Sequence, residues 1–399
     1  MKYIYVIGTC DTKYNELKFV KDTIKRLGIS ALLVDVGTKR HNNKVDITNK
    51  EVSTFHPHEK DFLTRIDDRG KAVTLMAEAL QEFLKQKKDL AGVIGLGGSG
   101  GTSIITAGMR VLNIGIPKVM VSTVASGNVA PYVGPNDICM MYSVTDVAGL
   151  NRISKKVFSN AANAIVGMVK FKKDEVDYDK PAIGMTMFGV TTPCVDAVRK
   201  QLEKDFDCLV FHATGTGGQA MEKLLDSGML AGIIDITTTE ICDLLLGGVM
   251  SAGEDRLGAV IRTKKPYVGS VGALDMVNFG TKETVPEKYK DRNLYVHNPQ
   301  VTLMRTTPEE NKKIGEWIAK KLNKCEGEVR FLISEKGVSM IDAPGMLFYD
   351  PEADKALFDA IEKNLKQTDS RRLLKLPYHI NDKEFADELA KNFLEIINK

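Results

Sequence analysis

The chain has 399 residues, of which 43% are hydrophobic and 27% are charged, and its formal net charge is +3. This length exceeds what one hydrophobic core usually supports, so we expect two compact domains. A charge so close to neutral argues against nucleic acid or an anionic membrane as the main partner, because binding either one needs a strongly basic surface. Small molecules and protein partners remain.

The cysteines and the first residues favour a cytoplasmic protein. The six cysteines are widely spaced and form no C-x-x-C pair, which is typical of reduced thiols. The chain enters an apolar, strand-like run directly, without a basic region or a cleavage signal. No stretch approaches the 18 to 20 or so uninterrupted apolar residues that a membrane span needs.

Short apolar runs alternate with amphipathic segments through the first half, which predicts βα units around a mainly parallel sheet. The expected strands are Tyr3–Gly8, Ser30–Val36, Ala91–Leu96, Pro117–Ser122 and Ile138–Ser143. The expected helices begin with a stripe from Tyr14 to Leu27 and continue with Lys71–Lys87, Thr102–Leu112 and Arg152–Val169.

A charged segment ending at Pro181 separates this pattern from a second one, so we predict domains at 1–178 and 179–399. The second half is expected to contain strands at Ala182–Phe188, Cys208–Ala213, Gly232–Ile236, Asn293–His297 and Val329–Ser334, and helices at Cys194–Glu203, Gly217–Leu225, Pro308–Leu322 and Asp382–Ile397. The predicted fold class is α/β, with two Rossmann-like subdomains whose mainly parallel sheets are flanked by helices.

A glycine-rich turn follows the third predicted strand and opens a helix. It contains Gly97, Gly98, Ser99, Gly100, Gly101 and Thr102. Backbone N–H groups at such a helix start favour an anion, and the absence of side chains lets a phosphate approach. A strand-to-helix turn without a ligand is the alternative. No Walker-type lysine follows the glycines, so a cation must come from elsewhere.

Polar residues follow other strands at the same predicted edge, where open α/β sheets bind ligands. They are Thr9, Asp11 and Lys13, then Asp35, Gly37 and Thr38, and then Ser126 and Gly127 in a long loop over 123–137. Lys13 is placed to neutralise phosphate and Asp11 to hold Mg²⁺, although Asp11 is equally suited to be a plain helix N-cap. Asp35 is a candidate for ribose or metal contact.

The second half offers a weaker set of candidates. Its glycine-rich turn contains Gly215, Thr216, Gly217 and Gly218. With Asp235 about 20 residues further on, this turn also fits a dinucleotide fingerprint, so a nicotinamide cofactor is an alternative. Glu254, Asp255 and Arg256 are candidates for base, metal ligand and phosphate clamp, or else form a salt-bridged loop. His212, at a strand end, is a candidate acid/base group or a structural residue.

Several motifs together give a resemblance to a known family. They are Ile7-Gly-Thr-Cys-Asp-Thr-Lys13, Asp35-Val-Gly-Thr38, the glycine-rich turn, Ser122-Thr-Val-Ala-Ser-Gly-Asn128, Ser251-Ala-Gly-Glu-Asp-Arg256, Asp342-Ala-Pro-Gly345 and Tyr349-Asp-Pro-Glu352. Over nearly its whole length the chain resembles the Tm-1-like ATP-binding family, also called UPF0261. The resemblance implies two α/β subdomains, ATP and Mg²⁺ bound by the first of them near Ser122 and the turns above, and a homodimer.

Three hypotheses follow. The first is a nucleotide-dependent enzyme that binds ATP and Mg²⁺ in its first domain and transfers a phosphoryl or adenylyl group to a small molecule bound near Gly215–Gly218 and Glu254–Arg256. The second is a protein-binding module that ATP stabilises without turnover. The third is a nicotinamide-dependent enzyme.

Overall fold

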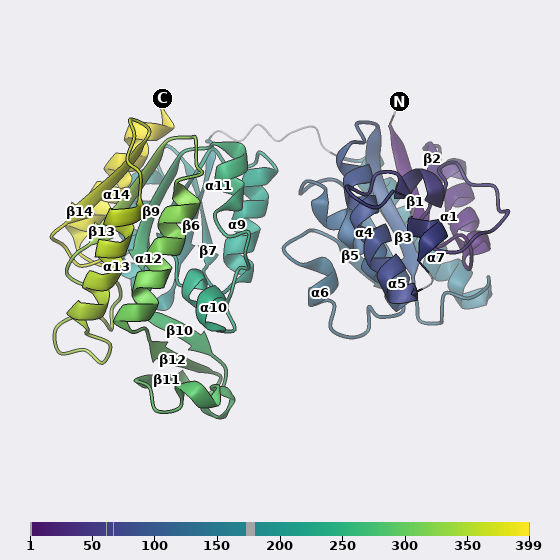
Figure 1. Cartoon of the computed structure of the whole chain (residues 1–399). Coiled ribbons are helices and arrows are strands. Elements are labelled where there is room, and N and C mark those ends of the chain that lie inside the picture. Colours follow the sequence, from purple (N-terminus) through teal and green to yellow (C-terminus); the bar gives the residue numbers. More distant parts are fainter. Residues whose placement is uncertain (1, 61, 67, 173–179, 399) are drawn as a thin grey trace. The chain divides into compact units, whose positions relative to one another are not determined.

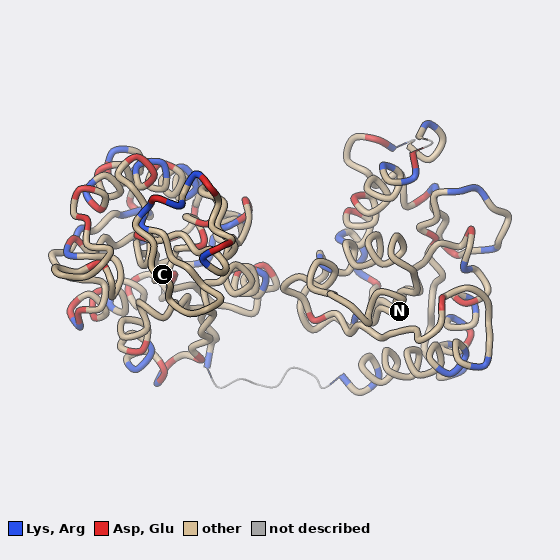
Figure 2. The backbone as a smooth tube through the Cα atoms, turned by 90° about the horizontal axis from the view of Figure 1, so that it is seen from below, with Lys and Arg blue, Asp and Glu red and all other residues tan. Residues whose placement is uncertain are grey.

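The structure, a computed structural model, describes residues 2–60, 62–66, 68–172 and 180–398 (Figure 1). The chain divides into two compact units, Met1–Val176 and Asp177–Lys399. The predicted boundary between residues 178 and 179 lies outside the described residues. Figure 2 shows that basic and acidic residues are interspersed along both units.

The first unit is built from βα units, as its alternating pattern predicts. Its strands are β1 (Tyr3–Gly8), β2 (Ala31–Asp35), β3 (Leu90–Gly97), β4 (Lys118–Ser122) and β5 (Cys139–Tyr142). Its helices are α1 (Tyr14–Arg26), α2 (Asn49–Ser53), α3 (Phe62–Arg65), α4 (Arg69–Lys85), α5 (Ser99–Val111), α6 (Ala130–Val133) and α7 (Arg152–Lys170).

Within the described residues these strands form one parallel sheet in the order β2-β1-β3-β4-β5. Helices α1 and α7 cover one face, while α4 and α5 cover the other (Figure 1). Because α1 and α4 lie on opposite faces, the winding reverses between β1 and β3. A reversal of this kind leaves a crevice at the carboxyl ends of the two strands.

The second unit repeats this plan with one more strand. Its main strands are β6 (Ala182–Met187), β7 (Asp207–His212), β8 (Gly232–Thr237), β9 (Tyr267–Gly272), β13 (Val329–Ser334) and β14 (Arg371–Leu376). Its α-helices are α8 (Thr192–Leu202), α9 (Thr216–Asp226), α10 (Glu240–Leu246), α11 (Gly258–Thr263), α12 (Pro308–Leu322), α13 (Pro351–Asn364) and α14 (Lys383–Ile397). Short 3₁₀ turns occur at Gly189–Thr191, Lys282–Thr284 and Glu287–Tyr289.

The main strands of this unit are parallel, in the order β14-β13-β9-β8-β6-β7. Numbered within its own unit, each sheet therefore begins 2-1-3-4-5, and the faint likeness between the halves is a likeness of topology. Helices α8 and α14 pack on one face of the sheet. Helices α9, α12 and α13 pack on the other face (Figure 1).

A small antiparallel sheet is inserted after β9. Its order is β10-β12-β11, formed by β10 (Met276–Phe279), β11 (Leu294–Asn298) and β12 (Val301–Arg305). The predicted α/β class with mainly parallel sheets is confirmed, and this insertion is the antiparallel exception. Among the described helices, none has the length and apolarity required to cross a bilayer.

Candidate functional site

The carboxyl ends of the first four strands lie in register at one edge of the first sheet. Gly8 at the end of β1 pairs with Asp35 at the end of β2, and Gly97 at the end of β3 pairs with Ser122 at the end of β4. Strand β1 also pairs with β3, which places the turn after Gly8 beside the turn after Gly97. The predicted site residues of this unit are therefore brought to one edge, at the reversal of winding.

Three glycines of the turn are required by neither backbone conformation nor packing. Gly98 has φ −81°, and Gly100 and Gly101 lie in the first turn of α5. A Cβ would meet nothing within 4 Å at Gly100, and its nearest neighbours at Gly98 and Gly101 would be 3.7 and 3.8 Å away. Only Gly97 is confined, since its Cβ would lie 3.0 Å from the backbone of Gly101. Among the described residues no side chain caps the start of α5, so its first N–H groups lack a side-chain acceptor.

The hydroxyls beside this turn fix its position. Thr102 Oγ1 and Ser122 Oγ are buried and lie 2.6 Å apart, and Ser122 Oγ also accepts a hydrogen bond from the Val124 N–H at 3.1 Å. This contact ties the start of α5 to the loop after β4. The nearby residues Ser99, Ser126 and Gly127 are exposed. The hydroxyls of Thr102 and Ser122 instead hold the turn in place.

In this structure the Asp35 carboxylate binds backbone N–H groups. Its Oδ1 accepts hydrogen bonds from the N–H groups of Cys10 and Gly37, each at 2.8 Å, and its Oδ2 lies 2.8 Å from His41 Nε2. The residue is 1% exposed. Both oxygens of Asp35 therefore help to shape the turns after β1 and β2, and its expected role in ribose or metal contact stays a prediction.

Lys13 and Glu16 fasten a second loop over the turn after β1. The Lys13 ammonium donates to the Val147 carbonyl, and the Glu16 carboxylate accepts from the Gly149 N–H. In the turn itself, the carbonyl of Thr9 accepts from the N–H groups of Thr12 and Lys13 at 3.1 and 2.9 Å. Lys13 is therefore anchored at this edge, with its charge beside the loop that follows β5.

Asp11 is the candidate metal ligand of this edge. A Cβ on Gly37 would lie 2.9 Å from Asp11 Oδ1, so the carboxylate stands directly beside the turn after β2. Thr38 is partly exposed in the same turn. Among the described residues, no group of three or more His, Cys, Asp or Glu side chains is arranged to hold a metal. Asp11 would therefore supply Mg²⁺ with one carboxylate ligand only. Phosphate and water would supply the others, which is common for this ion.

The second glycine-rich turn is filled by the protein's own carboxylate. Glu240 is fully buried, and its Oε1 accepts hydrogen bonds from the N–H groups of Gly215 and Gly218 at 2.7 and 3.0 Å. A Cβ on Gly218 would lie 2.0 Å from Glu240 Oε2, and one on Gly217 would lie 1.8 Å from the His212 carbonyl. The expectation that Gly215–Gly218 bind a substrate is thereby corrected, because packing and Glu240 account for these glycines.

Arg256 is the centre of a buried ion cluster. Its guanidinium donates to Glu222 at 2.9 Å, to Asp235 at 2.7 Å and to Glu240 at 2.9 Å, and its side chain is 1% exposed. Burial alone would lower the pKa of Arg256, but the three carboxylates outweigh it and raise that pKa. Burial also raises the pKa of Glu222 and Glu240, against the attraction of Arg256.

Arg256 and Asp235 therefore lose their predicted ligand roles. All three guanidinium nitrogens of Arg256 are paired inside the unit, so it cannot clamp a phosphate from solvent. Asp235, the acid of the dinucleotide fingerprint, is fully buried and also accepts hydrogen bonds from Thr186 and Tyr267. The nicotinamide alternative loses its ribose ligand by this arrangement.

The remaining candidates of the second unit are exposed and separate. Asp255 pairs with Arg262 at 2.8 Å on the surface, and the Glu254 carbonyl accepts from Lys321 at 2.6 Å. His212 ends β7 at the side of the sheet and packs edge-on against Phe188, with 5.3 Å between the ring centroids. Partial burial lowers the pKa of His212. The structure does not assemble these three residues into one site.

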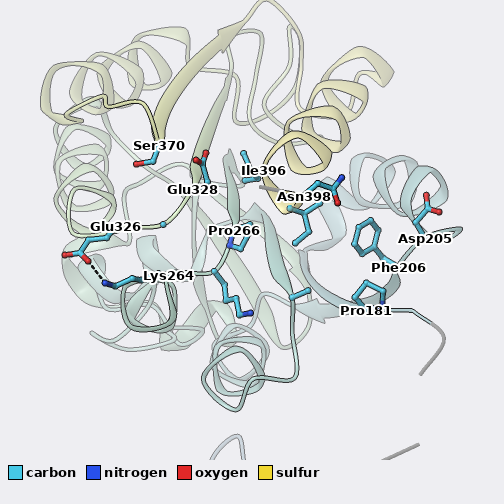
Figure 3. Close-up of a pocket in the computed structure, with 14 residues that line it drawn as sticks. Pro181, Asp205, Phe206, Lys264, Pro266, Glu326, Glu328, Ser370, Ile396 and Asn398 are labelled. Atoms are coloured by element: carbon cyan, nitrogen blue, oxygen red, sulfur yellow. Dashed lines mark ion pairs between the residues drawn. The ribbon is translucent and has the colours of Figure 1, made fainter. Parts of the chain in front are cut away.

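A cavity of about 670 Å³ lies at the amino ends of the strands of the second sheet (Figure 3). Its walls come from segments that precede the strands, including Pro181, Phe206, Pro266 and Ser370. Lys264 and Glu326 form an ion pair across part of its rim. Ligands of open α/β sheets bind at the carboxyl ends of strands, so we do not place the candidate site here.

The sequence did not reveal the buried carboxylates that bind the second glycine-rich turn and Arg256. Glu240 and Glu222 received no role, although Glu240 follows Thr237-Thr-Thr239 shortly after an apolar strand, where an acidic residue is typical of a helix start. It also left the motifs Asp342-Ala-Pro-Gly345 and Tyr349-Asp-Pro-Glu352 without chemistry. Both contribute residues to a cavity of about 550 Å³ beside the loop after β13.

The fold and the first unit's edge define a class, namely proteins with two doubly wound α/β units and an open glycine-rich turn at a reversal of winding. Family comparisons agree with the two units. Residues 2–174 match the N-terminal domain, and residues 180–397 the C-terminal domain, of "Uncharacterised protein family (UPF0261)". The chain belongs to the UPF0261 family.

Relatives cover the whole chain. A UPF0261 protein from Rhizobium meliloti is 57% identical over 398 residues, covering 100% of both chains. One from Clostridium tetani is 48% identical over 403 residues, again covering 100% of both. The ToMV resistance protein Tm-1(GCR237) of Solanum lycopersicum is 45% identical over 421 residues, covering 99% of this chain and 56% of that protein. The predicted family and its relation to Tm-1 are confirmed.

Proposed function

We propose that the first unit binds ATP with Mg²⁺ and that its phosphates lie on the turn Gly97–Thr102. One observation carries this proposal: Gly98, Gly100 and Gly101 lack side chains although neither φ nor packing requires glycine there. Bare N–H groups at an uncapped helix start are suited to an anion that approaches the backbone closely. The turn also lies at the reversal of winding, where such sheets bind nucleotides.

The neighbouring residues support a nucleotide in particular. Lys13 would offset phosphate charge from the turn after β1, and Asp11 would supply one oxygen to Mg²⁺. Thr9, Thr38, Ser99, Ser126 and Gly127 would line the same edge. When bound, the metal would neutralise charge on the phosphates.

We further propose that the protein is a cytoplasmic, homodimeric, nucleotide-dependent enzyme acting on a small metabolite. The cytoplasm is supported by six free cysteines, which are typical of a reducing compartment. The homodimer rests on the family resemblance, and sedimentation of the full chain tests it. An ATP-stabilised protein-binding module is the alternative, and it predicts ATP binding with no release of phosphate or AMP in the presence of candidate small acids.

The test of ATP binding uses Gly100, where side chains fit. Gly100→Asp places a carboxylate at the helix start, which favours α5 through the helix dipole but repels phosphate. Gly100→Asn has nearly the same shape without the charge and serves as the control. We expect calorimetric titration with ATP and Mg²⁺ to show an affinity loss of about tenfold or more for the Asp variant and a smaller loss for Asn. Equal affinities for wild type and Gly100→Asp would refute the placement.

A further inference from the structure

The small antiparallel sheet of the second unit has an outer strand, β11, that is paired on one side only. Its single neighbouring strand among the described residues is β12. Figure 1 shows β11 as the strand of this insertion that lies farthest from the main sheet. All residues from Tyr295 to Asn298 are exposed, Tyr295 by 37% and Val296 by 48%. The free side of β11 is therefore an open row of backbone hydrogen-bonding groups.

The backbone groups on this free side belong to Leu294 and Val296. The Asn293 carbonyl accepts from the Arg305 N–H of β12 at 3.0 Å, so the backbone of Asn293 faces β12. The two strands keep one register from Leu294 to Val296, and backbone directions alternate along an antiparallel strand. The N–H and C=O groups of Leu294 and Val296 therefore point away from β12, where the described residues offer them no partner.

This edge also lacks the protection that outer strands usually have. Natural outer strands are commonly charged or covered, but β11 contains no Lys, Arg, Asp or Glu. By contrast, β14 has three basic residues, and a bridge between Val34 and Ile47 covers part of β2. Strands β5 and β7 are outer strands as well, but their central residues Met140–Met141 and Cys208–Leu209 are half-buried. Among the described strands, β11 therefore has the most open edge.

An exposed apolar surface adjoins β11. Successive side chains alternate along a strand, so Asn293 and Tyr295 lie on the same face. Asn293 Nδ2 donates to the Leu347 carbonyl at 2.9 Å, which holds the loop after β13 beside this face. Met346 and Leu347 of that loop are each more than half exposed. Together with Tyr295 they form the kind of apolar surface that marks a protein interface.

We propose that β11 is the interface strand of the homodimer, in which it pairs antiparallel with β11 of a second copy about a two-fold axis at Tyr295. This inference rests on the proposed homodimer and names its surface. With the axis at Tyr295, Leu294 faces the partner's Val296, so both residues with free backbone groups gain hydrogen-bonding partners. An axis at either of those two residues would pair it with its own copy and leave the other without its counterpart.

A second copy suits this edge because the strand does not repel itself. With the axis at Tyr295, Asp291 and Arg292 face uncharged residues of the partner's hairpin, so no like charges meet. Arg292 is also neutralised within its own unit by Glu310, at 2.8 Å. Tyr295 faces the partner's Tyr295 at a non-hydrogen-bonded position, where side chains come closest and aromatic pairs stabilise the strands. A strongly charged partner would find no complementary charge on β11.

Disulfide cross-linking of the full chain tests the position of the axis. Residues directly opposed at a non-hydrogen-bonded position have Cα atoms about 4.5 Å apart, a distance that a disulfide spans. Tyr295→Cys should therefore give a covalent dimer of two 44.0 kDa chains under mild oxidation. Val296→Cys is the matched control, because its two copies would be more than about 7 Å apart, beyond the reach of a disulfide.

The wild-type chain under the same oxidation shows any cross-linking through its own cysteines, of which Cys139 is exposed. Wild type and Val296→Cys should both remain largely uncross-linked. Absence of a covalent dimer in Tyr295→Cys, or equal cross-linking of the two variants, would overturn the proposal.

Charge variants separate pairing from folding. Tyr295→Lys and Tyr295→Glu each place like charges face to face, so sedimentation should show the dissociation constant of the dimer raised by about tenfold or more. An equimolar mixture of the two should form mixed dimers, because opposite charges then meet at the axis. Val210→Lys, an exposed change on the outer strand β7, should sediment as wild type.

These outcomes distinguish the interface from the dimer itself. A dimeric wild type whose Tyr295→Lys and Tyr295→Glu variants remain dimeric would refute the β11 interface alone. A wild type that sediments as a monomer would refute the homodimer together with its interface. Failure of the two charge variants to associate when mixed would also contradict pairing at Tyr295.

Discussion

Arg256 shows how burial and pairing fix the role of a residue. Its three carboxylate partners come from α9, β8 and the start of α10, which are 16 to 34 residues away in the chain. The local sequence around Arg256 contains the arginine but not these partners. Taken alone, that motif therefore predicts a phosphate clamp. In the fold, the same guanidinium stabilises the packing of three elements.

Removing this guanidinium should strongly destabilise the second unit. We expect Arg256→Met to lower the free energy of unfolding by about 3 to 5 kcal/mol at pH 7.5, because it leaves buried carboxylates unpaired. The loss should shrink as the pH is lowered, because burial raises the pKa of Glu222 and Glu240, and acids with raised pKa values destabilise the fold as pH rises. Urea denaturation followed by fluorescence of Trp317, the single tryptophan, reports on this unit.

A matched surface variant separates burial from charge. Arg262 also pairs with two carboxylates, Asp226 and Asp255, but its side chain is 48% exposed. Arg262→Ala should cost no more than about 1 kcal/mol, because water screens exposed pairs. Similar losses for Arg256→Met and Arg262→Ala would contradict the buried cluster.

At the scale of elements, the two glycine-rich helix starts have different causes. Gly100 and Gly217 each occupy the second position of their helices, α5 and α9. Glycine is confined at Gly217 by the His212 carbonyl, whereas Gly100 faces open space. The sequence shows two similar turns. Only the surrounding packing distinguishes the turn at Gly217, where a side chain has no room, from the turn at Gly100, where it has.

Alanine at these two positions should therefore have opposite effects. Gly100→Ala should stabilise the first unit by about 0.5 to 1 kcal/mol, the usual gain of alanine over glycine in a helix. Gly217→Ala should destabilise the second unit by about 3 kcal/mol or more, because its Cβ would overlap a backbone carbonyl. Calorimetric melting of the two variants provides the comparison, and destabilisation by Gly100→Ala would show that its turn is also filled.

Periodicity predicts most elements because their apolar residues repeat with a clear spacing. Helix α12 and strand β13 have the predicted bounds, and β1 does as well. Strand β9 was not predicted: it is central and fully buried, yet its sequence contains Gly269, Ser270 and Gly272 in place of bulky apolar residues. Gly269 makes room for the ring of Tyr267, a contact that no local pattern reveals. Strand β14 was not predicted either, because three of its six residues are basic.

The candidate site was predictable only where backbone alone defines it. The turn at Gly97–Thr102 follows from a strand, glycines and a helix in succession, and the structure places it at the expected edge. Asp354 and Asp342, which meet at Arg305, depend on contacts between β12, α13 and the loop after β13, which pair residues far apart in the chain. Such a cluster emerges only from the assembled unit.

For the whole molecule, two compact units imply two unfolding events. Differential scanning calorimetry should show two transitions, and the Trp317 fluorescence change should accompany only the transition of the second unit. Adding ATP and Mg²⁺ at 100 times the dissociation constant should stabilise the first unit alone, by about 2.7 kcal/mol. A shift of the Trp317 transition by ATP would place the nucleotide elsewhere.

The occupied start of α9 has a consequence for how each unit responds to its surroundings. Glu240 is covalently part of the chain, so its effective concentration at Gly215 and Gly218 is constant whatever the solution contains. An anion at the start of α5 would instead come and go with its own abundance. Of these two helix starts, only that of α5 is therefore able to report the level of a dissolved anion to the rest of the protein.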